Sequence, residues 1–190
     1  MTKTVAWGIL GAANIARKCV IPALLASSRC RVRALGSRDP KSAAKWARGL
    51  AIENVVEGYD AVLADPAVEA VYIPLPNHMH LPWTLKAVEA GKHVLCEKPL
   101  ALNAAQARRM IDTARRHDRT LMEALWTRFL PALAAVREQI AHGAIGDVRM
   151  VHADFGFHAT FDAQSRLYAP ALGGGTLLDI GIYPLNLAFM

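Results

Sequence analysis

Lys98 is the residue of this chain whose type and position most clearly suggest chemistry. It lies between Glu97 and Pro99, directly after the apolar run 94–96. That run predicts a buried parallel strand, and the carboxyl end of such a strand faces the crevice where open α/β sheets bind ligands. A lysine at this point is a candidate for acid–base chemistry. Taken alone, an exposed lysine at a strand end is the simpler interpretation, and the other motifs decide between the two.

Asp179 and Tyr183 form a second pair with chemical potential. They are four residues apart in a segment of helical pattern that follows Gly173–Gly175, so they share one helical face. A carboxylate and a phenol together could bind and protonate a carbonyl or alcohol oxygen, and a neighbouring ammonium such as Lys98 would assist the phenol. A tyrosine satisfied by a backbone carbonyl is an equally good interpretation of Tyr183 by itself.

The stretch 8–16 lies where the first predicted strand passes into the first predicted helix. Glycine permits a tight turn and close approach of a pyrophosphate there, and the helix N-terminus attracts its charge. Read as G-x-G-x-x-G from Gly11, the second and third glycine positions hold Ala13 and Ala16. Alanine is accepted at the third position. At the second position, Ala13 leaves less room for the backbone to approach the pyrophosphate. We favour a dinucleotide turn over a plain strand–helix turn, with contacts from Gly11, Ala13, Asn14 and Ile15.

Ser37 and Arg38 follow the second predicted strand. An acidic residue near this point binds a ribose 2′-hydroxyl, whereas arginine suits a 2′-phosphate. The first acid is Asp39, which is better placed as the cap of the next helix. The pair therefore favours NADP over NAD, with NAD and a solvent-facing arginine as the alternatives.

A loop with several polar residues follows the fourth predicted strand. Pro76 and Asn77 lead it, and Asn77 could hydrogen-bond the ribose of a cofactor. His78 and His80 have H-x-H spacing, which can bind a metal, but no cysteine or carboxylate partner is evident. We expect no metal site, and instead a capping or ligand-edge role in which His80 contributes to the cofactor site.

The elements that must position these residues alternate between apolar runs and helical patterns, which is typical of βαβ units and a parallel sheet. Strands are expected at residues 5–10, 31–36, 55–56, 70–73, 93–96 and 120–123. Helices are expected at residues 14–26 with a kink at Pro22, 40–50, 59–63, 80–90, 103–117 and 131–142. The fold class is α/β, an N-terminal Rossmann domain with a doubly wound parallel sheet.

The pattern changes after about residue 123. Residues 148–157 alternate in part, which predicts a longer strand of a mostly antiparallel sheet with one wet face, and residues 176–190 look helical. We place the domain boundary within 124–147 and assign residues 1–123 to the Rossmann domain and 124–190 to the start of an α+β domain. One strand and one helix cannot close a second core, so this domain is expected to be incomplete.

Composition excludes several classes of protein. The 190 residues are 53% hydrophobic, and no apolar run is long enough for a membrane span or a signal peptide. The net charge of +6 would suit a nucleic-acid partner, but the basic residues do not cluster, and Arg108-Arg109 and Arg115-Arg116 fit a solvated helix face. The three cysteines form no C-x-x-C pair. We therefore expect a cytoplasmic protein with reduced thiols that binds neither nucleic acid nor membranes.

Taken together, these motifs resemble the Gfo/Idh/MocA family of NAD(P)-dependent oxidoreductases over essentially the whole chain. The resemblance rests on residues 8–16, Pro76-Asn77, Glu97-Lys98-Pro99 and 174–184. Residues 122–129, together with Tyr183 at a position that is often histidine elsewhere, look most like the branch of dimeric dihydrodiol dehydrogenase and NADP-dependent D-xylose dehydrogenase.

The resemblance implies hydride transfer between a nicotinamide and a sugar or trans-diol CH–OH group. It implies that Lys98 orients and polarises the substrate hydroxyl, that Tyr183 is the general acid/base and that Asp179 holds substrate. Trp126 and Phe155 match aromatic positions that line the substrate pocket in this branch.

For the cofactor, the resemblance adds Glu97, Lys98 and Arg128, and it implies a cis peptide before Pro99. Family members are considerably longer, so the C-terminal domain, which usually supplies the pocket floor and a homodimer face, is expected to be truncated. A non-catalytic nucleotide-binding module is therefore the alternative function.

Overall fold

The computed structural model describes residues 4–190, which form two compact units. The first unit ends at Glu123, and the second comprises Ala124–Met190.

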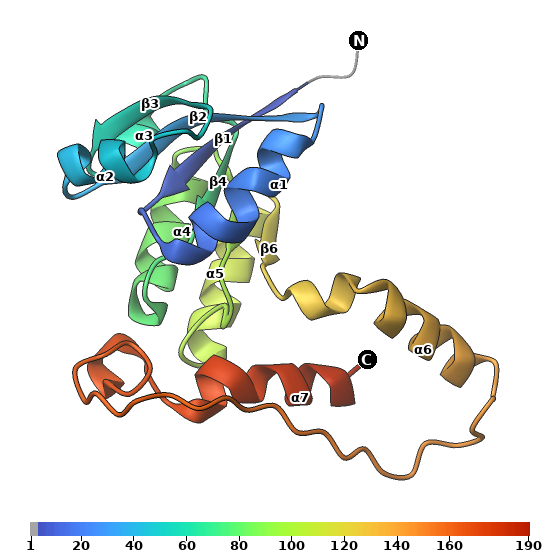
Figure 1. Cartoon of the computed structure of the whole chain (residues 1–190). Coiled ribbons are helices and arrows are strands. Elements are labelled where there is room, and N and C mark those ends of the chain that lie inside the picture. The colour runs from blue at the N-terminus through green and yellow to red at the C-terminus, as the bar shows by residue number, and fades with distance from the viewer. Residues whose placement is uncertain (1–3) are drawn as a thin grey trace. The chain divides into compact units, whose positions relative to one another are not determined.

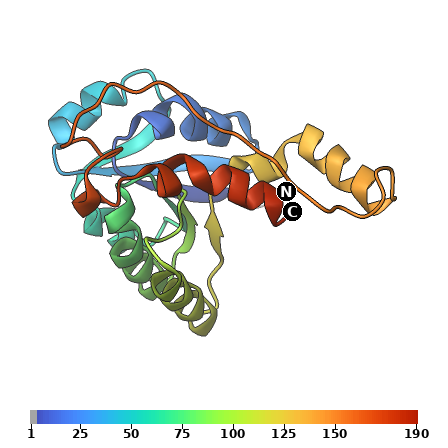
Figure 2. The ribbon, with the colours of Figure 1, turned by 90° about the horizontal axis from the view of Figure 1, so that it is seen from below.

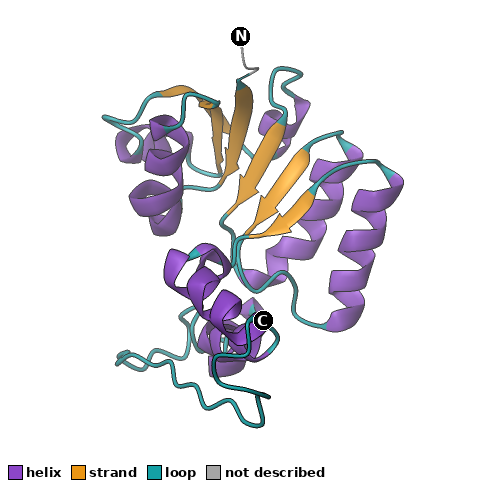
Figure 3. Cartoon of the chain, turned by 90° about the vertical axis from the view of Figure 1, so that its right-hand side faces the viewer, coloured by secondary structure: helices purple, strands orange, loops and turns teal. Residues whose placement is uncertain are grey.

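The first unit is built on one six-stranded sheet in the order β3-β2-β1-β4-β5-β6 (Figures 1 and 3). The strands are β1 (Val5–Leu10), β2 (Cys30–Ser37), β3 (Ile52–Glu57), β4 (Ala70–Ile73), β5 (His93–Cys96) and β6 (Leu121–Glu123). All neighbouring strands pair in parallel. The order turns around at β1, with β2 and β3 on one side and β4 to β6 on the other. Such a reversal opens a crevice at the carboxyl ends of the strands.

Helices connect the strands and lie on both sides of the sheet (Figure 3). They are the π turn η1 (Ala16–Val20) with α1 (Ile21–Ala26), α2 (Pro40–Trp46), α3 (Asp60–Ala64), the 3-10 turn η2 (Asn77–Met79), α4 (His80–Glu89) and α5 (Ala104–Arg116). Figure 1 shows α1 in front of the sheet and α4 and α5 behind it, and Figure 2 shows α4 and α5 side by side. The predicted parallel Rossmann sheet is therefore confirmed.

Local sequence signals set where two of these helices begin. The Asp39 carboxylate accepts the Ser42 N–H at 3.0 Å at the start of α2, and the Asn103 side chain accepts the Gln106 N–H at 3.0 Å at the start of α5. Each bond satisfies one of the donors that a helix leaves unpaired at its N-terminus. Because each helix follows a strand of the sheet, the caps also mark where the loops at the carboxyl edge of the sheet end.

One side of the sheet carries the main core. Leu10, Val71 and Ile73 of the strands pack in one cluster with Val88 of α4 and Met110 of α5, all essentially without exposed surface. The whole of β4 is buried, as expected for a parallel strand covered on both faces. This packing fixes the strand ends from which the site residues project.

The second unit is helical and irregular. It contains the 3-10 turn η3 (Trp126–Phe129), α6 (Pro131–Ala141), the 3-10 turn η4 (Pro170–Leu172), the π turn η5 (Leu177–Gly181) and α7 (Ile182–Ala188). The helix expected at residues 176–190 is present, but it begins with a π turn that carries Asp179. π turns are frequent at functional sites.

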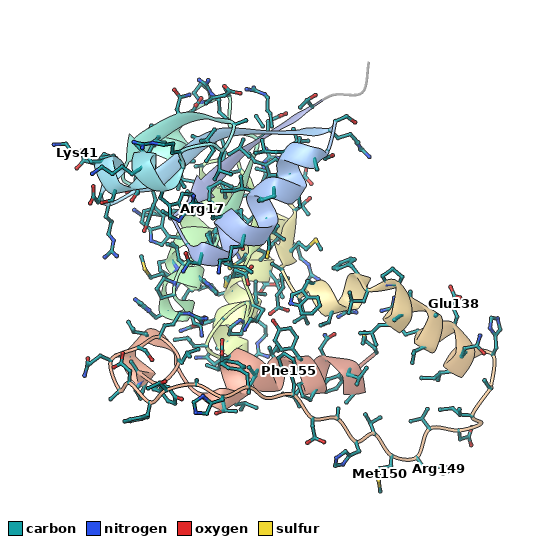
Figure 4. All side chains as sticks on the ribbon, in the orientation of Figure 1. Arg17, Lys41, Glu138, Arg149, Met150 and Phe155 are labelled. Carbon is teal, nitrogen blue, oxygen red and sulfur yellow. The ribbon has the colours of Figure 1, made fainter. Side chains whose placement is uncertain are left out.

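The strand expected at residues 148–157 is wrong. These residues form an irregular extended segment, and residues 124–190 contain no strand. A strand is stable only when a neighbouring strand takes its backbone hydrogen bonds, and this unit offers none. Arg149 and Met150 project from the segment (Figure 4), and Met150 is 85% exposed. The antiparallel sheet expected here is therefore absent from the described residues.

Between residues 4 and 190, none of the helices combines the length and the apolar character that crossing a bilayer requires.

Candidate functional site

The predicted cofactor residues of the first unit come together at the carboxyl edge of its sheet. Gly11 follows β1, Ser37 ends β2, Asn77 follows β4 and Lys98 follows β5. Because these strands are parallel and adjacent in the order β2-β1-β4-β5, their loops share one edge. This is the edge at which open α/β sheets bind ligands.

The turn after β1 requires glycine at position 11. Gly11 has φ = +112°, and a Cβ on it would lie 2.9 Å from Cδ2 of Leu75. Its N–H donates to the carbonyl of Gly36 at 2.9 Å, which ties the turn to β2. Asn14 and Ile15, at the start of the helix that follows, are exposed, and Ala13 is half-buried. The turn therefore presents an open backbone surface, as a pyrophosphate cradle requires.

The polar side chains at the end of β2 have two different roles. The Ser37 hydroxyl donates to the carbonyl of Asp39 at 3.1 Å and accepts its N–H at 3.2 Å. The Asp39 carboxylate caps α2, and the hydrogen bond from Ser42 lowers the pKa of that carboxyl group. Asp39 is therefore engaged by the helix, whereas the Arg38 side chain is exposed. An exposed guanidinium at this position is a group that can bind a 2′-phosphate.

His80 is not at the ligand edge, contrary to its prediction as a direct cofactor contact. Its side chain has no exposed surface, so it cannot touch a molecule in the crevice. Its Nδ1 lies 2.8 Å from the carbonyl oxygen of Pro99, and its Nε2 lies 2.8 Å from that of Leu75. Burial lowers the pKa of His80, while the two carbonyl oxygens act in the opposite direction. His80 thus links the loop after β4 to the loop after β5.

The H-x-H pair does not assemble a metal site. Both ring nitrogens of His80 face carbonyl oxygens, and His78 is exposed. Among residues 4–190, no three His, Cys, Asp or Glu side chains gather as metal ligands do.

Lys98 lies in a turn formed by residues 97–100, which we name the lysine turn. The Lys98–Pro99 peptide is cis, as the resemblance implies, and the Lys98 side chain is half-buried. The Glu97 carboxylate accepts the hydroxyl of Tyr72 at 2.5 Å and the Lys98 N–H at 3.2 Å. Burial and the Glu97 charge raise the pKa of Tyr72, so its hydroxyl stays protonated and donates. Lys98 therefore projects from a tightly bonded piece of backbone.

Two of the residues around the lysine turn were not singled out in the sequence. The Glu123 carboxylate, at the end of β6, accepts the Leu100 N–H at 2.7 Å. A charged residue at a strand end was the signal that identified Lys98, and the same signal marks Glu123. Tyr72 is the one hydroxyl in the apolar run 70–73 of β4, which was a weaker signal.

In the second unit, Trp126, Phe155 and Tyr183 form an aromatic cluster. The Trp126 and Phe155 ring centroids lie 5.9 Å and 4.9 Å from that of Tyr183, both in edge-on geometry. The indole N–H of Trp126 donates to the Tyr183 hydroxyl at 3.2 Å. Trp126 is 54% and Phe155 49% exposed, so their rings present apolar surface next to a hydroxyl. Figure 4 labels Phe155 on the segment between α6 and η4.

Asp179 is 9% exposed and forms an ion pair with Arg166, whose nitrogen lies 3.3 Å from the carboxylate. No pattern in the sequence marked Arg166 as a partner of Asp179. Arg128, an expected cofactor contact, lies in η3 with its side chain exposed. The second unit therefore brings a phenol, a carboxylate and exposed aromatic rings into one polypeptide segment.

Comparisons with known proteins cover most of the chain. Residues 5–125 match the model of an oxidoreductase family with an NAD-binding Rossmann fold, and residues 133–190 match the GFO/IDH/MocA C-terminal domain. Trans-1,2-dihydrobenzene-1,2-diol dehydrogenase of Mus musculus is 40% identical over 93% of this chain and 53% of its own length. D-xylose 1-dehydrogenase (NADP(+)) 2 of Haloferax volcanii is 40% identical over 96% of this chain and 55% of its own length.

Among solved structures, a 3-ketoreductase of Actinomadura kijaniata in complex with NADP and TDP-benzene is similar with a TM-score of 0.90. It is 38% identical, and the match covers 98% of this chain and 57% of the other. The chain thus spans about half the length of the relatives it matches.

Proposed function

The chain belongs to the Gfo/Idh/MocA family of oxidoreductases, and from that premise we propose that it binds NADP and serves hydride transfer to or from a sugar or trans-diol CH–OH group. The observation that carries the proposal is the position of Lys98, in a tightly bonded turn at the same sheet edge as the Gly11 turn. Relatives with 40% identity include a diol dehydrogenase and an NADP(+)-dependent D-xylose dehydrogenase.

The residues at the sheet edge fit a dinucleotide. Gly11 has no room for a Cβ, which would lie 2.9 Å from Cδ2 of Leu75, and the helix start at Asn14 and Ile15 is open to solvent. Gly11, Ala13, Asn14 and Ile15 would hold the pyrophosphate, and Pro76, Asn77 and Glu97 would border the nicotinamide end. Arg128 of the second unit would add a further cofactor contact. Bound NADP supplies a site that accepts or gives hydride, which no side chain can do.

Ser37 and Arg38 support NADP over NAD. A guanidinium forms charge-assisted hydrogen bonds with a phosphate dianion, and Asp39 is engaged as a helix cap, so it does not compete for a ribose hydroxyl.

The remaining residues would act on the substrate. Lys98 would donate a hydrogen bond to the reacting hydroxyl, and Tyr183 would give or take its proton as general acid/base. The buried Asp179 would accept hydrogen bonds from further hydroxyls, and Trp126 and Phe155 would cover an apolar face of the substrate. Hydroxyl-rich molecules with apolar CH faces combine both requirements, which is why a sugar or diol fits.

The test combines binding with turnover. NADPH is titrated into the 190-residue protein while cofactor fluorescence is followed, and aldoses and trans-diols are then assayed. Turnover should fall at least about 100-fold in Lys98→Met and Tyr183→Phe, and remain in the matched controls Lys86→Met and Tyr168→Phe. Failure to bind NADPH would refute the proposal, and binding without turnover would favour a non-catalytic nucleotide-binding module.

A cytoplasmic location and a homodimer of the longer form belong to the same proposal. Cell fractionation and the sedimentation of a chain extended to the length of its relatives would test them.

A further inference from the structure

Three side chains from three different elements hold the lysine turn. Tyr72 of β4 donates to Glu97 at 2.5 Å, the first residue of the turn. His80, at the start of α4, contacts the Pro99 carbonyl at 2.8 Å, and Glu123, at the end of β6, accepts the Leu100 N–H at 2.7 Å. All of these contacts lie within the first unit.

The three contacts enclose Lys98 from both directions along the chain. One holds the residue before it, and two hold the residues that follow. The Lys98 N–H itself donates to the Glu97 carboxylate at 3.2 Å, so the backbone of Lys98 is held as well. Two of the acceptors are carboxylates, and hydrogen bonds to a carboxylate are about twice as strong as neutral ones.

We propose that Tyr72, His80 and Glu123 are positioning residues that together set the place of Lys98 relative to the bound cofactor. This inference rests on the proposed function, because it assigns Lys98 a task at the nicotinamide. None of the three touches a reacting atom; each acts through the backbone or the carboxylate of the lysine turn.

His80 gives the arrangement a second consequence. Its other nitrogen contacts the carbonyl of Leu75, which directly precedes the proposed cofactor residues Pro76 and Asn77. One buried ring therefore lies against both the cofactor loop and the lysine turn, and in its neutral form it donates to one of the two carbonyl oxygens. A displacement of about 1 Å in such a constellation costs on the order of 100-fold in rate.

Burial makes the arrangement stable against competition from water. Tyr72 and His80 have no exposed surface, so water reaches neither side chain without local opening of the core. Burial and Glu97 raise the pKa of Tyr72, which keeps this hydroxyl a donor at ordinary pH. The Leu100 N–H donates to the Glu123 carboxylate at 2.7 Å, so removal of that carboxylate would cost this backbone donor a hydrogen bond.

The experiment uses the 190-residue protein and the variants Tyr72→Phe, Glu123→Ala and Glu123→Gln. The matched control is Thr113→Val, which removes a hydrogen bond from Arg116 in α5. Amide hydrogen exchange of Leu100, acylation of the Lys98 amine with and without NADPH, NADPH affinity and thermal stability are measured for each protein.

In Glu123→Ala, exchange of the Leu100 amide should accelerate about tenfold, which corresponds to loss of one hydrogen bond. Glu123→Gln should restore slow exchange, since its carboxamide oxygen can still accept the same N–H. In Tyr72→Phe and Glu123→Ala, NADPH should protect Lys98 from acylation about tenfold less than in the wild type, while NADPH affinity changes less than about threefold. Thr113→Val should change neither exchange nor protection.

The outcomes separate the two proposals. Wild-type protection of Lys98 in both Tyr72→Phe and Glu123→Ala would overturn the positioning role, and so would equal effects in Thr113→Val. If NADPH does not bind the wild type, the proposed function fails. The positioning role is then tested separately on the proteins without cofactor. It is refuted if the variants exchange the Leu100 amide and acylate Lys98 as the wild type does.

Discussion

The indole nitrogen of Trp126 donates a hydrogen bond of 3.2 Å to the hydroxyl oxygen of Tyr183. Because this bond occupies a lone pair of the phenol oxygen, the hydroxyl hydrogen of Tyr183 points elsewhere and can serve as a donor. Edge-on packing of Phe155 at 4.9 Å restricts the same ring. If Tyr183 is the general acid/base, Trp126 and Phe155 therefore decide in which direction its proton leaves.

Replacement of Trp126 by phenylalanine tests this orientation. Trp126→Phe keeps an aromatic ring but removes the N–H, so kcat/KM on the best substrate should fall about fivefold to tenfold, the value of one neutral hydrogen bond. Steady-state kinetics measure the change. Phe161→Leu alters another exposed ring of the second unit and should leave kcat/KM within about twofold; equal losses in both variants would contradict the orientation by Trp126.

Gly11→Ala tests the dinucleotide turn. The new Cβ would meet Leu75 at 2.9 Å on a backbone with φ = +112°, which strains the turn by about 1–3 kcal/mol. NADPH affinity should fall at least about tenfold by fluorescence titration, with a lower Tm. Gly156→Ala, where a Cβ meets nothing within 4 Å, is the control. Unchanged affinity in Gly11→Ala would place the pyrophosphate elsewhere.

Arg38→Ala tests the choice of cofactor. A charge-assisted hydrogen bond is worth about 1.5–3 kcal/mol, so NADPH affinity should fall about 10-fold to 100-fold while NADH affinity stays within about twofold. Arg48→Ala removes an exposed positive charge just after α2, and it should affect both cofactors little. A parallel loss for NADPH and NADH in Arg38→Ala would rule out recognition of the 2′-phosphate by Arg38.

His80 predicts a dependence of stability on pH. Burial lowers the pKa of His80 in the folded chain, so below about pH 6.5 the unfolded chain binds this proton and the folded chain does not. The contribution to stability is complete above about pH 6.5 and is lost as the pH falls toward the folded pKa. Tm should therefore decline between about pH 7.5 and 5.5 more steeply in the wild type than in His80→Gln.

Thermal unfolding followed by circular dichroism measures the two slopes. His117→Gln, which changes an exposed histidine after α5, should decline as the wild type does. If Tm depends on pH equally in the wild type and in His80→Gln, His80 titrates alike in the folded and the unfolded chain.

The sequence predicted best the short strands at the centre of the sheet. The bounds of β1, β4 and β5 agree with the predicted ranges, because a covered parallel strand is a continuous apolar run with polar residues at its ends. By contrast, β3 was predicted at residues 55–56 and extends over Ile52–Glu57. It is an edge strand, and Glu53 pairs with Arg31 and Arg33 of β2. Hydrophobic patterning cannot detect a strand stabilised by ion pairs across the ladder.

The candidate site was predictable only where its signals are local. The glycine turn and the residues after each strand follow from spacing along the chain, and the predicted cis peptide before Pro99 is confirmed. The contacts of Glu97 with Tyr72 and of Leu100 with Glu123 join residues that are 25 and 23 positions apart. They depend on which strands become neighbours, and for the same reason the sequence assigned His80 to the cofactor instead of the core.

The contacts of Tyr72, His80 and Glu123 with the lysine turn all lie within residues 72–123. The aromatic rings and the carboxylate assigned to the substrate all come from the segment after Glu123. Mutations that diversify the later segment consequently leave the scaffolding of the lysine intact. Exchange of residues 124–190 for the corresponding segment of another relative would keep these three contacts, so the architecture suits the recombination of substrate specificities.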